Sequence, residues 1–411
     1  MENFVFLTNQ YLPKPGATGL CVHKLAKKLA EKGENVYTIC YEDGDKEKQY
    51  DGVNVVKIHI PPFLKDNQSA SNIKRKYQYC MSLFSKLVHL HRYPLRSMQL
   101  VYNYIKEVEK IVLEQGYVTI IASYTPLEAV VAAMKIKKKY PNAVKIVYYS
   151  TDTLSNEQSD GGILSRNYRT KSGINWEKKL FEVFDKILVM ECHKDHYYSD
   201  IFEEFREKFA LVNFPLFEKI ENYYPEEKNN INEICLVYAG TLYQKLRNPC
   251  FLNSILIGLS EKIELEAIFL GGGDCEEIMK KAEEDSKESI KYLGMQPHNI
   301  AKKYISSADI LLSIGNVESP MAPSKIYEYM STGKPIIHTY TYDKDPCIEP
   351  LRRYGNALLL KNTDQNGVRK ALEFIKNRSC IQYEEVEKVF IKSTPSYTIN
   401  IILEELGDQN D

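Results

Sequence analysis

The sequence predicts an α/β protein made of two Rossmann-like, doubly wound domains with a cleft between them. Three observations lead to this prediction. The chain has 411 residues, about twice the length that one hydrophobic core usually supports. Apolar runs alternate with amphipathic stretches, a pattern typical of a parallel sheet with helices on both faces. The alternation stops at a polar segment near the middle of the chain and then begins again.

The first half supplies the elements of an N-terminal domain, residues 1–215. Short runs rich in Val, Ile, Phe and Tyr predict buried strands, and longer stretches with apolar residues three or four apart predict helices. We expect strands near 3–8, 35–40, 54–59, 118–122, 144–149 and 186–190, and helices near 19–32, 75–115, 126–139 and 173–182.

The second half repeats the pattern in a C-terminal domain, residues 231–392. A polar, charged run predicts the linker between the domains at 216–230, and residues 393–411 contain a last helical stretch. We expect strands near 234–239, 265–270, 290–293, 309–313, 335–338 and 357–360, and helices near 248–260, 274–285, 298–306, 323–332 and 366–376.

The composition is that of an ordinary globular protein. With 44% hydrophobic and 27% charged residues and a net charge of −1, the chain gives no reason to expect nucleic acid as a partner. Its nine cysteines form no Cys-x-x-Cys pair, so we expect reduced thiols in a cytoplasmic protein. The N-terminus shows no signal-peptide pattern, and no stretch reaches the roughly 20 apolar residues that span a bilayer.

The most informative motif covers residues 323–337, PSKIYEYMSTGKPII. Ser324 is a candidate N-cap of a short helix. The first amides of this helix, including those of Lys325 and Ile326, favour an anion such as a phosphate. Glu328 can accept hydrogen bonds from the two hydroxyls of a ribose. The motif therefore predicts a binding site for a nucleotide diphosphate sugar.

With this motif the chain resembles, over nearly its whole length, the retaining glycosyltransferases of family 4, which have the GT-B architecture. That family carries two glutamates at a fixed spacing in this region. Glu328 matches the second, which holds the nucleotide ribose. Pro320 stands where the first would contact the transferred sugar, and Glu318, two residues earlier, is the candidate to replace it. The resemblance also implies that the helix within 393–411 packs on the N-terminal domain.

A loop with two cations follows the strand expected near 234–239. It begins with Gly240 and Thr241 and continues to Lys245 and Arg247. Cations ahead of a helix can neutralise a diphosphate leaving group without a metal. By the resemblance, Arg247 stands nearest the position of the family's lysine, and Lys245 is the competing candidate. Thr241 stands where relatives carry an arginine. The alternative for an isolated cation is a solvated surface charge.

Two glycine-containing loops are further candidates for substrate binding, because glycine lets backbone amides approach a ligand closely. The first follows the first strand and lacks the spacing of the dinucleotide fingerprint, and the resemblance assigns the second to the nucleobase. The residues are Gly16, Ala17, Thr18 and Gly19 in the first loop, and Gly294 and Met295 in the second. A tight turn without ligand is the alternative for the first loop, as it is for the triple glycine at 271–273.

Asp152 follows the strand expected near 144–149. Many relatives carry a histidine near this place, on the acceptor side of the reacting carbon, and this stretch has none. A carboxylate at the end of a strand could orient or deprotonate an acceptor hydroxyl. It could equally cap the next segment.

We expect no metal in the chemistry. Asp43-Gly44-Asp45 and Asp343-Lys344-Asp345 have the letters of the Asp-x-Asp metal motif of another glycosyltransferase fold, but both are predicted to be solvated turns. His193 and His196 follow Cys192 without a second group of ligands, which is poor support for a zinc site.

The stretch from residue 74 to 96 is rich in Lys and Arg, with apolar residues interleaved. It predicts either a basic amphipathic helix on an anionic membrane surface or a helix that packs on the sheet with its cations in water. In the first case the protein would be peripheral on the inner face of the membrane, close to a lipid-linked acceptor.

These features together predict a retaining, metal-independent hexosyltransferase without a cofactor. The donor would be a nucleotide diphosphate sugar, and the acceptor a glycan or lipid-linked glycan of cell-surface polysaccharide or glycolipid biosynthesis. In this mechanism Asp152, Lys245, Arg247 and Glu318 would serve catalysis. Two alternatives remain: a non-catalytic nucleotide-binding partner of the same fold and a sugar-nucleotide epimerase, for which the sequence shows no persuasive set of acids and histidines.

Overall fold

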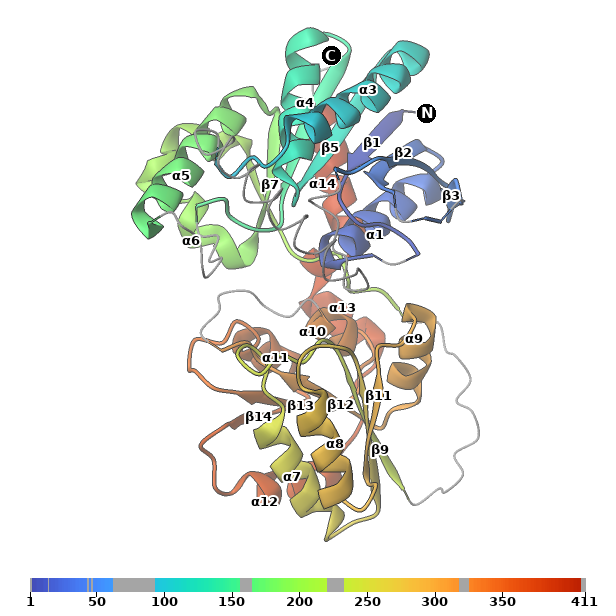
Figure 1. Cartoon of the computed structure of the whole chain (residues 1–411), viewed down its shortest axis with the longest axis vertical. Helices are drawn as coiled ribbons and strands as arrows, with labels where there is room; N and C mark the ends of the chain where they lie inside the picture. Colours follow the sequence, from blue (N-terminus) through green and yellow to red (C-terminus); the bar gives the residue numbers. More distant parts are fainter. Residues whose placement is uncertain are drawn as a thin grey trace, which may run out of the picture. The chain divides into compact units, whose positions relative to one another are not determined.

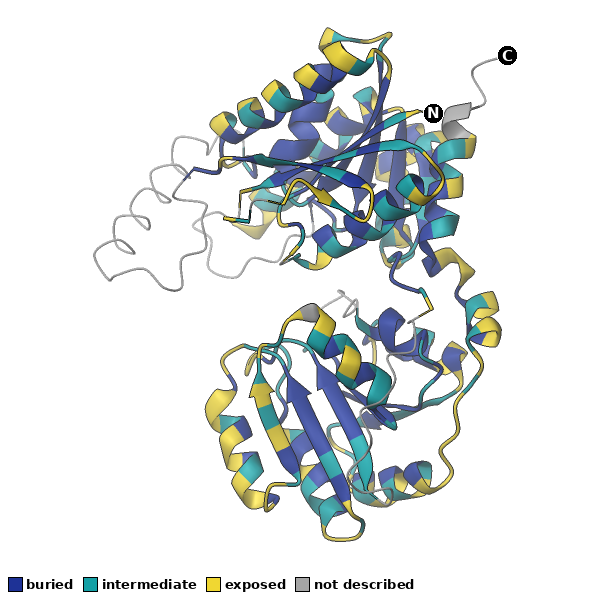
Figure 2. Cartoon of the chain, turned by 90° about the vertical axis from the view of Figure 1, so that its right-hand side faces the viewer, coloured by how far each residue is buried: buried dark blue, intermediate teal, exposed yellow. Residues whose placement is uncertain are grey.

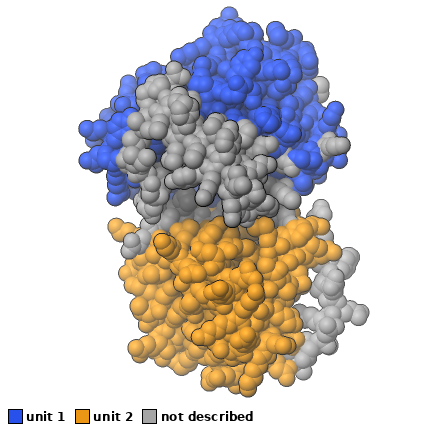
Figure 3. All heavy atoms as spheres, in the orientation of Figure 1, with its two compact units in different colours: residues 1–215, 395–411 blue, residues 216–394 orange. Residues whose placement is uncertain are grey.

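The computed structural model describes residues 2–13, 15–42, 44–45, 47–61, 93–155, 165–219, 233–317 and 325–407. The chain divides into two compact units, which are coloured separately in Figure 3. Unit 1 comprises Met1–Pro215 and Pro395–Asp411, and unit 2 comprises Leu216–Thr394. Each unit has its own hydrophobic core built on a central sheet, whose buried strands are dark blue in Figure 2.

The sheet of unit 1 has eight strands in the order β3-β4-β2-β1-β5-β6-β7-β8. All neighbours are parallel except β3 and β4. The strands are β1 (Asn3–Leu7), β2 (Asn35–Tyr41), β3 (Gln49–Tyr50), β4 (Val53–Ile58), β5 (Val118–Tyr124), β6 (Val144–Ser150), β7 (Lys186–Met190) and β8 (Phe209–Val212).

The helices of unit 1 cover this sheet, as Figure 1 shows. The last helix of the chain packs against the first, so residues distant in sequence complete one unit. The helices are α1 (Ala17–Glu31), α3 (Met98–Gln115), α4 (Leu127–Lys139), α5 (Arg166–Val183), α6 (Lys194–Tyr197) and α14 (Pro395–Gly407), with 3-10 turns at Glu191–His193 and Asp200–Lys208.

Two helices of unit 1 begin elsewhere than the sequence predicts. The helix expected over 75–115 includes residues 93–97, which are not helical, and α3 starts after the N-cap Ser97, whose Oγ accepts a hydrogen bond from the amide of Leu100. Residues 75–92 lie outside the described part. Helix α5 starts about two turns before the predicted residue 173, after the N-cap Ser165, because polar residues in its first turns obscure the apolar period.

The sheet of unit 2 has six parallel strands in the order β11-β10-β9-β12-β13-β14. The chain first builds outward from β9 to β11 and then from β12 to β14 on the other side. The direction reverses between β9 and β12, the kind of switch point where parallel sheets bind ligands at their carboxyl ends. The strands are β9 (Ile234–Ala239), β10 (Leu265–Leu270), β11 (Ile290–Gly294), β12 (Ile310–Ile314), β13 (Ile336–Tyr340) and β14 (Ala357–Lys361).

All six strands of unit 2 fall where the sequence predicts them, but two of its helices, α11 and α13, were not predicted. Both are only seven residues long, too short for an apolar period to stand out. In the described part of the chain no helix is long and apolar enough to cross a membrane. The helices of unit 2 are α7 (Cys250–Ser260), α8 (Glu276–Asp285), α9 (His298–Ser307), α10 (Lys325–Met330), α11 (Ile348–Tyr354), α12 (Gly367–Lys376) and α13 (Tyr383–Val389).

Candidate functional site

The loops that follow β9 and β10 are bonded to each other at the carboxyl edge of the sheet of unit 2. The amide of Gly240 donates to the carbonyl of Leu270, and the amide of Leu242 donates to that of Gly272, both at 2.8 Å. The amide of Gly271 in turn donates to the carbonyl of Gly294, at the end of β11. Three strand ends are thus joined through their backbones, which holds the loops in one fixed arrangement.

Glycine is required where these loops touch. A Cβ on Gly271 would lie 1.8 Å from the carbonyl oxygen of Gly240, and a Cβ on Gly273 would lie 1.7 Å from that of Leu242. Gly273 also has φ +129°, a conformation that residues with a side chain rarely adopt. The triple glycine is therefore more than the simple turn considered from the sequence, because it permits one loop to lie on the other.

The cationic loop is fixed to the end of β12. Arg247 donates from Nε to Oδ1 of Asn316 at 2.5 Å, and the amide of Val317 donates to the carbonyl of Leu246 at 2.8 Å. The other cation, Lys245, is exposed, and no residue of the described part pairs with its ammonium. Arg247 is therefore held at the switch point between β9 and β12, whereas Lys245 is available at the surface.

Helix α10 is attached to the end of β9 through a buried tyrosine. Tyr329 Oη accepts a hydrogen bond of 2.7 Å from the amide of Ala239, the residue before Gly240. One position earlier on the helix, Glu328 accepts a hydrogen bond of 2.6 Å from Nζ of Lys325, and only 10% of its side chain is exposed. The predicted acid thus lies on the helix that contacts β9.

The other residues of unit 2 that the sequence predicts to bind substrate differ in how far they are exposed. Ile326 is buried, with 1% of its surface exposed, so only its backbone is a candidate for ligand binding. Gly294 has φ +65°, and Met295 is 78% exposed, at the strand end joined to the glycine loop. Glu318 and Ser324 lie outside the described residues, as do 74–92 of the basic stretch.

The first glycine loop lies at the start of α1 in unit 1. Gly16 is the N-cap of this helix, whose first turn has no acidic residue and no side-chain cap. A Cβ on Gly19 would lie 1.8 Å from the carbonyl oxygen of Gln10, so the helix can begin against the loop only with glycine here. Ala17 and Thr18 supply the first amides of α1, and these have no partner within a helix.

Asp152 lies directly after β6, next to a histidine that the sequence analysis did not connect with it. Nε2 of His193 is 3.9 Å from Oδ1 of Asp152. His193 follows β7, the parallel neighbour of β6, and the ends of parallel neighbours meet at one edge. Burial, with a smaller contribution from nearby His196, lowers the pKa of His193 below the usual range. A histidine thus lies next to Asp152, at the end of the neighbouring strand β7.

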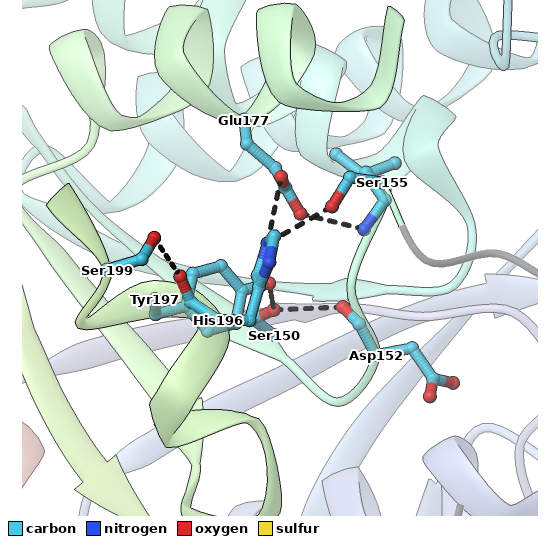
Figure 4. A network of polar contacts seen from close by, with 8 residues as sticks. Ser150, Asp152, Ser155, Glu177, His196, Tyr197 and Ser199 are labelled. Carbon is cyan, nitrogen blue, oxygen red and sulfur yellow. Dashed lines mark hydrogen bonds and ion pairs between the residues drawn. The ribbon is translucent and has the colours of Figure 1, made fainter. Parts of the chain in front are cut away.

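A buried polar network supports this edge of the sheet (Figure 4). Ser150 Oγ donates to the carbonyl of Asp152 and is 2.7 Å from Oη of Tyr197. Glu177 contacts His196 Nε2 at 3.2 Å, and Ser155 Oγ lies 3.1 Å from the same nitrogen. Because serine and glutamate share one nitrogen, this is not the relay of a serine hydrolase, in which they use opposite nitrogens. The carboxylate of Asp152 points away from the network.

Replacing Glu177 with alanine is expected to destabilise unit 1. The side chain of Glu177 is fully buried and accepts a hydrogen bond of 2.9 Å from the amide of Leu154, which the variant would leave unsatisfied. We expect the free energy of unfolding to fall by about 1–3 kcal/mol, measured by urea denaturation. Glu182→Ala, at an exposed position of the same helix, should leave it unchanged, and equal values for both variants would contradict the role of Glu177.

Solved structures similar to this chain are GT-B glycosyltransferases. The sucrose-phosphate synthase of Thermosynechococcus elongatus has a TM-score of 0.61 at 13% identity, covering 100% of this chain and 99% of the other. Anabaena HepE, in complex with UDP and glucose, has 0.58 at 14%, covering 99% of both. The catalytic domain of Arabidopsis thaliana starch synthase IV, bound to ADP and acarbose, has 0.59 at 12%, covering 99% of both.

No family model matches the chain, and no curated protein matches it in sequence. The similarity in structure extends over the whole chain and includes both Rossmann-like units. It confirms the prediction from the sequence that the protein has the GT-B fold.

Proposed function

We propose that the protein is a glycosyltransferase that moves a hexose from a nucleotide diphosphate sugar to a glycan or lipid-linked glycan acceptor. The reaction would retain the anomeric configuration and need no metal or cofactor. We further propose a role in the synthesis of a cell-surface polysaccharide or glycolipid, at the cytoplasmic side of the membrane.

The observation that carries this proposal is the joined edge of unit 2. Backbone amides and Arg247 lie at this edge, at the switch point of a parallel sheet, where ligands bind. Helix α10, which carries Glu328, is bonded to the end of β9 through Tyr329. In the proposed complex Glu328 holds the ribose hydroxyls, and Gly294 with Met295 borders the nucleobase. Arg247 or Lys245 neutralises the departing diphosphate, a role that charged donors can fill without a metal. Structures of similar fold bound to UDP or ADP support a nucleotide donor.

Unit 1 would supply the acceptor side. Asp152, with 40% of its side chain exposed, is accessible to an acceptor hydroxyl, and His193 beside it would orient the carboxylate or share the proton. The first amides of α1, at Gly16 to Gly19, would face anionic groups of the substrates.

Binding of nucleotides is the test of the proposal. We would titrate the purified protein with UDP, GDP, ADP and CMP and their sugars without added metal, using calorimetry and thermal shift. A ligand at about 100 times its dissociation constant stabilises the native state by roughly 2.7 kcal/mol, and we expect this for one nucleotide diphosphate. No binding at millimolar concentration would overturn the proposal. Binding without turnover of the sugar nucleotide on any acceptor would favour the non-catalytic partner.

The pairing of His193 with Asp152 predicts the pH dependence of transfer. Because burial lowers the pKa of His193, the imidazole should stay neutral as the pH falls through about 6.5, the ordinary value for histidine. We expect the rate at saturating donor to be level down to that pH and to fall only below it, as the imidazole becomes charged. The pH–rate profile of His193→Asn should lack this acidic limb, and an unchanged limb in the variant would exclude His193 as its origin.

A further inference from the structure

A buried group of three metal-ligand side chains lies in unit 2, close to the end of β12, where Asn316 holds Arg247. His338 is in β13, and Asp345 and Cys347 lie between β13 and α11. One ligand atom from each lies within 4.8 Å of the other two. We refer to these three residues as the His338 cluster. Asp345 belongs to the Asp-x-Asp sequence expected in a solvated turn. Asp343 and Lys344 are exposed there, but the expectation is wrong for Asp345, of whose surface only 3% is exposed.

The polar atoms that face each other in the His338 cluster have no hydrogen-bond partners. Nε2 of His338 and Oδ2 of Asp345 are both buried and without such a partner, and the side chains of both residues are fully buried. The two atoms are 3.6 Å apart, beyond hydrogen-bond distance. Two unsatisfied buried ligand atoms that face each other call for an explanation.

A zinc ion accounts for this separation. Nitrogen and oxygen ligands each lie about 2.0–2.2 Å from zinc, so two of them at a tetrahedral ion are about 3.3 Å apart. A zinc-bound sulfur would be about 3.6 Å from either one. The ligand atoms now lie within 4.8 Å of one another, so zinc binding needs side-chain shifts of only about 1 Å. An imidazole, a carboxylate and a thiolate form a ligand set that zinc binds readily.

The surroundings orient these ligands as they do in metal sites. Ser313 Oγ lies 3.0 Å from Nδ1 of His338, so a proton on Nδ1 leaves the lone pair of Nε2 for a metal. Oδ1 of Asp345 accepts a hydrogen bond of 2.8 Å from the amide of Cys347, which leaves Oδ2 free for a metal. A Cβ on Gly315 would lie 1.8 Å from Oδ2 of Asp345 and 3.3 Å from Nε2 of His338, so glycine is required where the cluster meets the end of β12.

We propose that the His338 cluster binds one zinc ion through His338 Nε2, Asp345 Oδ2 and Cys347 Sγ, with a water molecule as the fourth ligand of the tetrahedral ion. On binding, a zinc–sulfur bond forms and the thiol proton leaves to water. The ion, the thiolate and the carboxylate then sum to zero charge, which removes the cost of a buried unpaired charge. The role is structural: the ion ties the loop before α11 to β13.

Metal content tests the proposal directly. Tag-free protein, purified under reducing conditions without chelators and dialysed anaerobically against stoichiometric zinc, should hold about one zinc per chain by plasma mass spectrometry. Cys347→Ala should lose the ion. Cys275→Ala, which removes another buried thiol of unit 2, should keep it. Equal zinc in both variants, or none in the unmodified protein, would overturn the proposal.

Substitution of cobalt for zinc tests the proposal in the unmodified protein, so the result does not depend on whether a variant folds. Replacement of zinc by Co²⁺ in the unmodified protein should produce the ultraviolet charge-transfer band of a cobalt–thiolate bond and visible bands typical of tetrahedral coordination. Stoichiometric zinc should abolish both. Spectra of octahedral, thiolate-free cobalt would contradict the assignment, and in that case His338 and Asp345 form a buried ion pair without a metal.

Discussion

Glu328→Ala is expected to abolish sugar transfer while the fold persists. The proposed role of Glu328 is to accept hydrogen bonds from the ribose, and each such bond to a charged group contributes about 1.5–3 kcal/mol. Losing two should weaken nucleotide binding by roughly 100-fold or more and lower kcat/KM at least as much. Calorimetry with the nucleotide and an assay of its release from the sugar nucleotide measure the two effects.

The burial of Glu328 makes the control variants essential. The side chain is 10% exposed and paired with Lys325, which is more burial than expected of an acid in a substrate site, so a purely structural role is the rival. Lys325 keeps 29% of its side chain exposed, and its ammonium can reach water when the partner is removed. We therefore expect Glu328→Ala to lower the Tm by only a few degrees, as a loss of about 1 kcal/mol would.

Two further variants separate the roles. Glu328→Gln keeps the shape and one acceptor oxygen, and should retain part of the nucleotide affinity. Glu349→Ala, at an exposed acid of α11, should change neither binding nor turnover. Glu328→Ala could instead lower the Tm strongly and still bind nucleotide with wild-type affinity at temperatures where the variant is folded. That result would show that the acid only stabilises α10.

The sheet of each unit was predictable because its strands are buried on both faces. Runs such as residues 118–124, buried throughout, read as strands without ambiguity. Alternation of strand and helix then determines a parallel arrangement. Segments that are short, or in which apolar residues repeat only weakly, were not predicted. They include β8, with four residues, and the seven-residue α11.

The sequence predicted only those parts of the candidate site that lie within a single loop. Glycine and cationic residues next to a strand end identified the loop at 240–247, but the bonding of that loop to residues 270–273 depends on pairing between strands. The contact of Asp152 with His193 has the same origin, since β6 and β7 are separated by the whole of α5. The burial of Asp345 was hidden because its neighbours Asp343 and Lys344 are polar and mark the segment as a turn.

Gly273→Ala is expected to abolish nucleotide binding by separating the loops after β9 and β10. The new Cβ would lie 1.7 Å from the carbonyl oxygen of Leu242, a backbone atom that cannot turn aside as a side chain can. In addition, φ of +129° at this position costs a residue with a side chain about 1–3 kcal/mol. The loop must therefore move, which breaks the bridge between Leu242 and Gly273 and displaces the start of the cationic loop.

Gly272→Ala is the matched control, one residue away in the same loop. Its Cβ would meet only the side chain of Met295, with the terminal methyl group at 3.3 Å and Cβ at 3.9 Å, and Met295 is 78% exposed, so its terminal methyl group can rotate away. We expect this variant to bind nucleotide within a fewfold of the unmodified protein, whereas Gly273→Ala binds at least about 100-fold more weakly, as a loss of 2.7 kcal/mol implies. The core of unit 2 lies below these loops, so circular dichroism should show both variants folded. If Gly273→Ala binds as well as Gly272→Ala, the close contact of the two loops does not shape the nucleotide site, and the proposal that this edge holds the donor loses its main support.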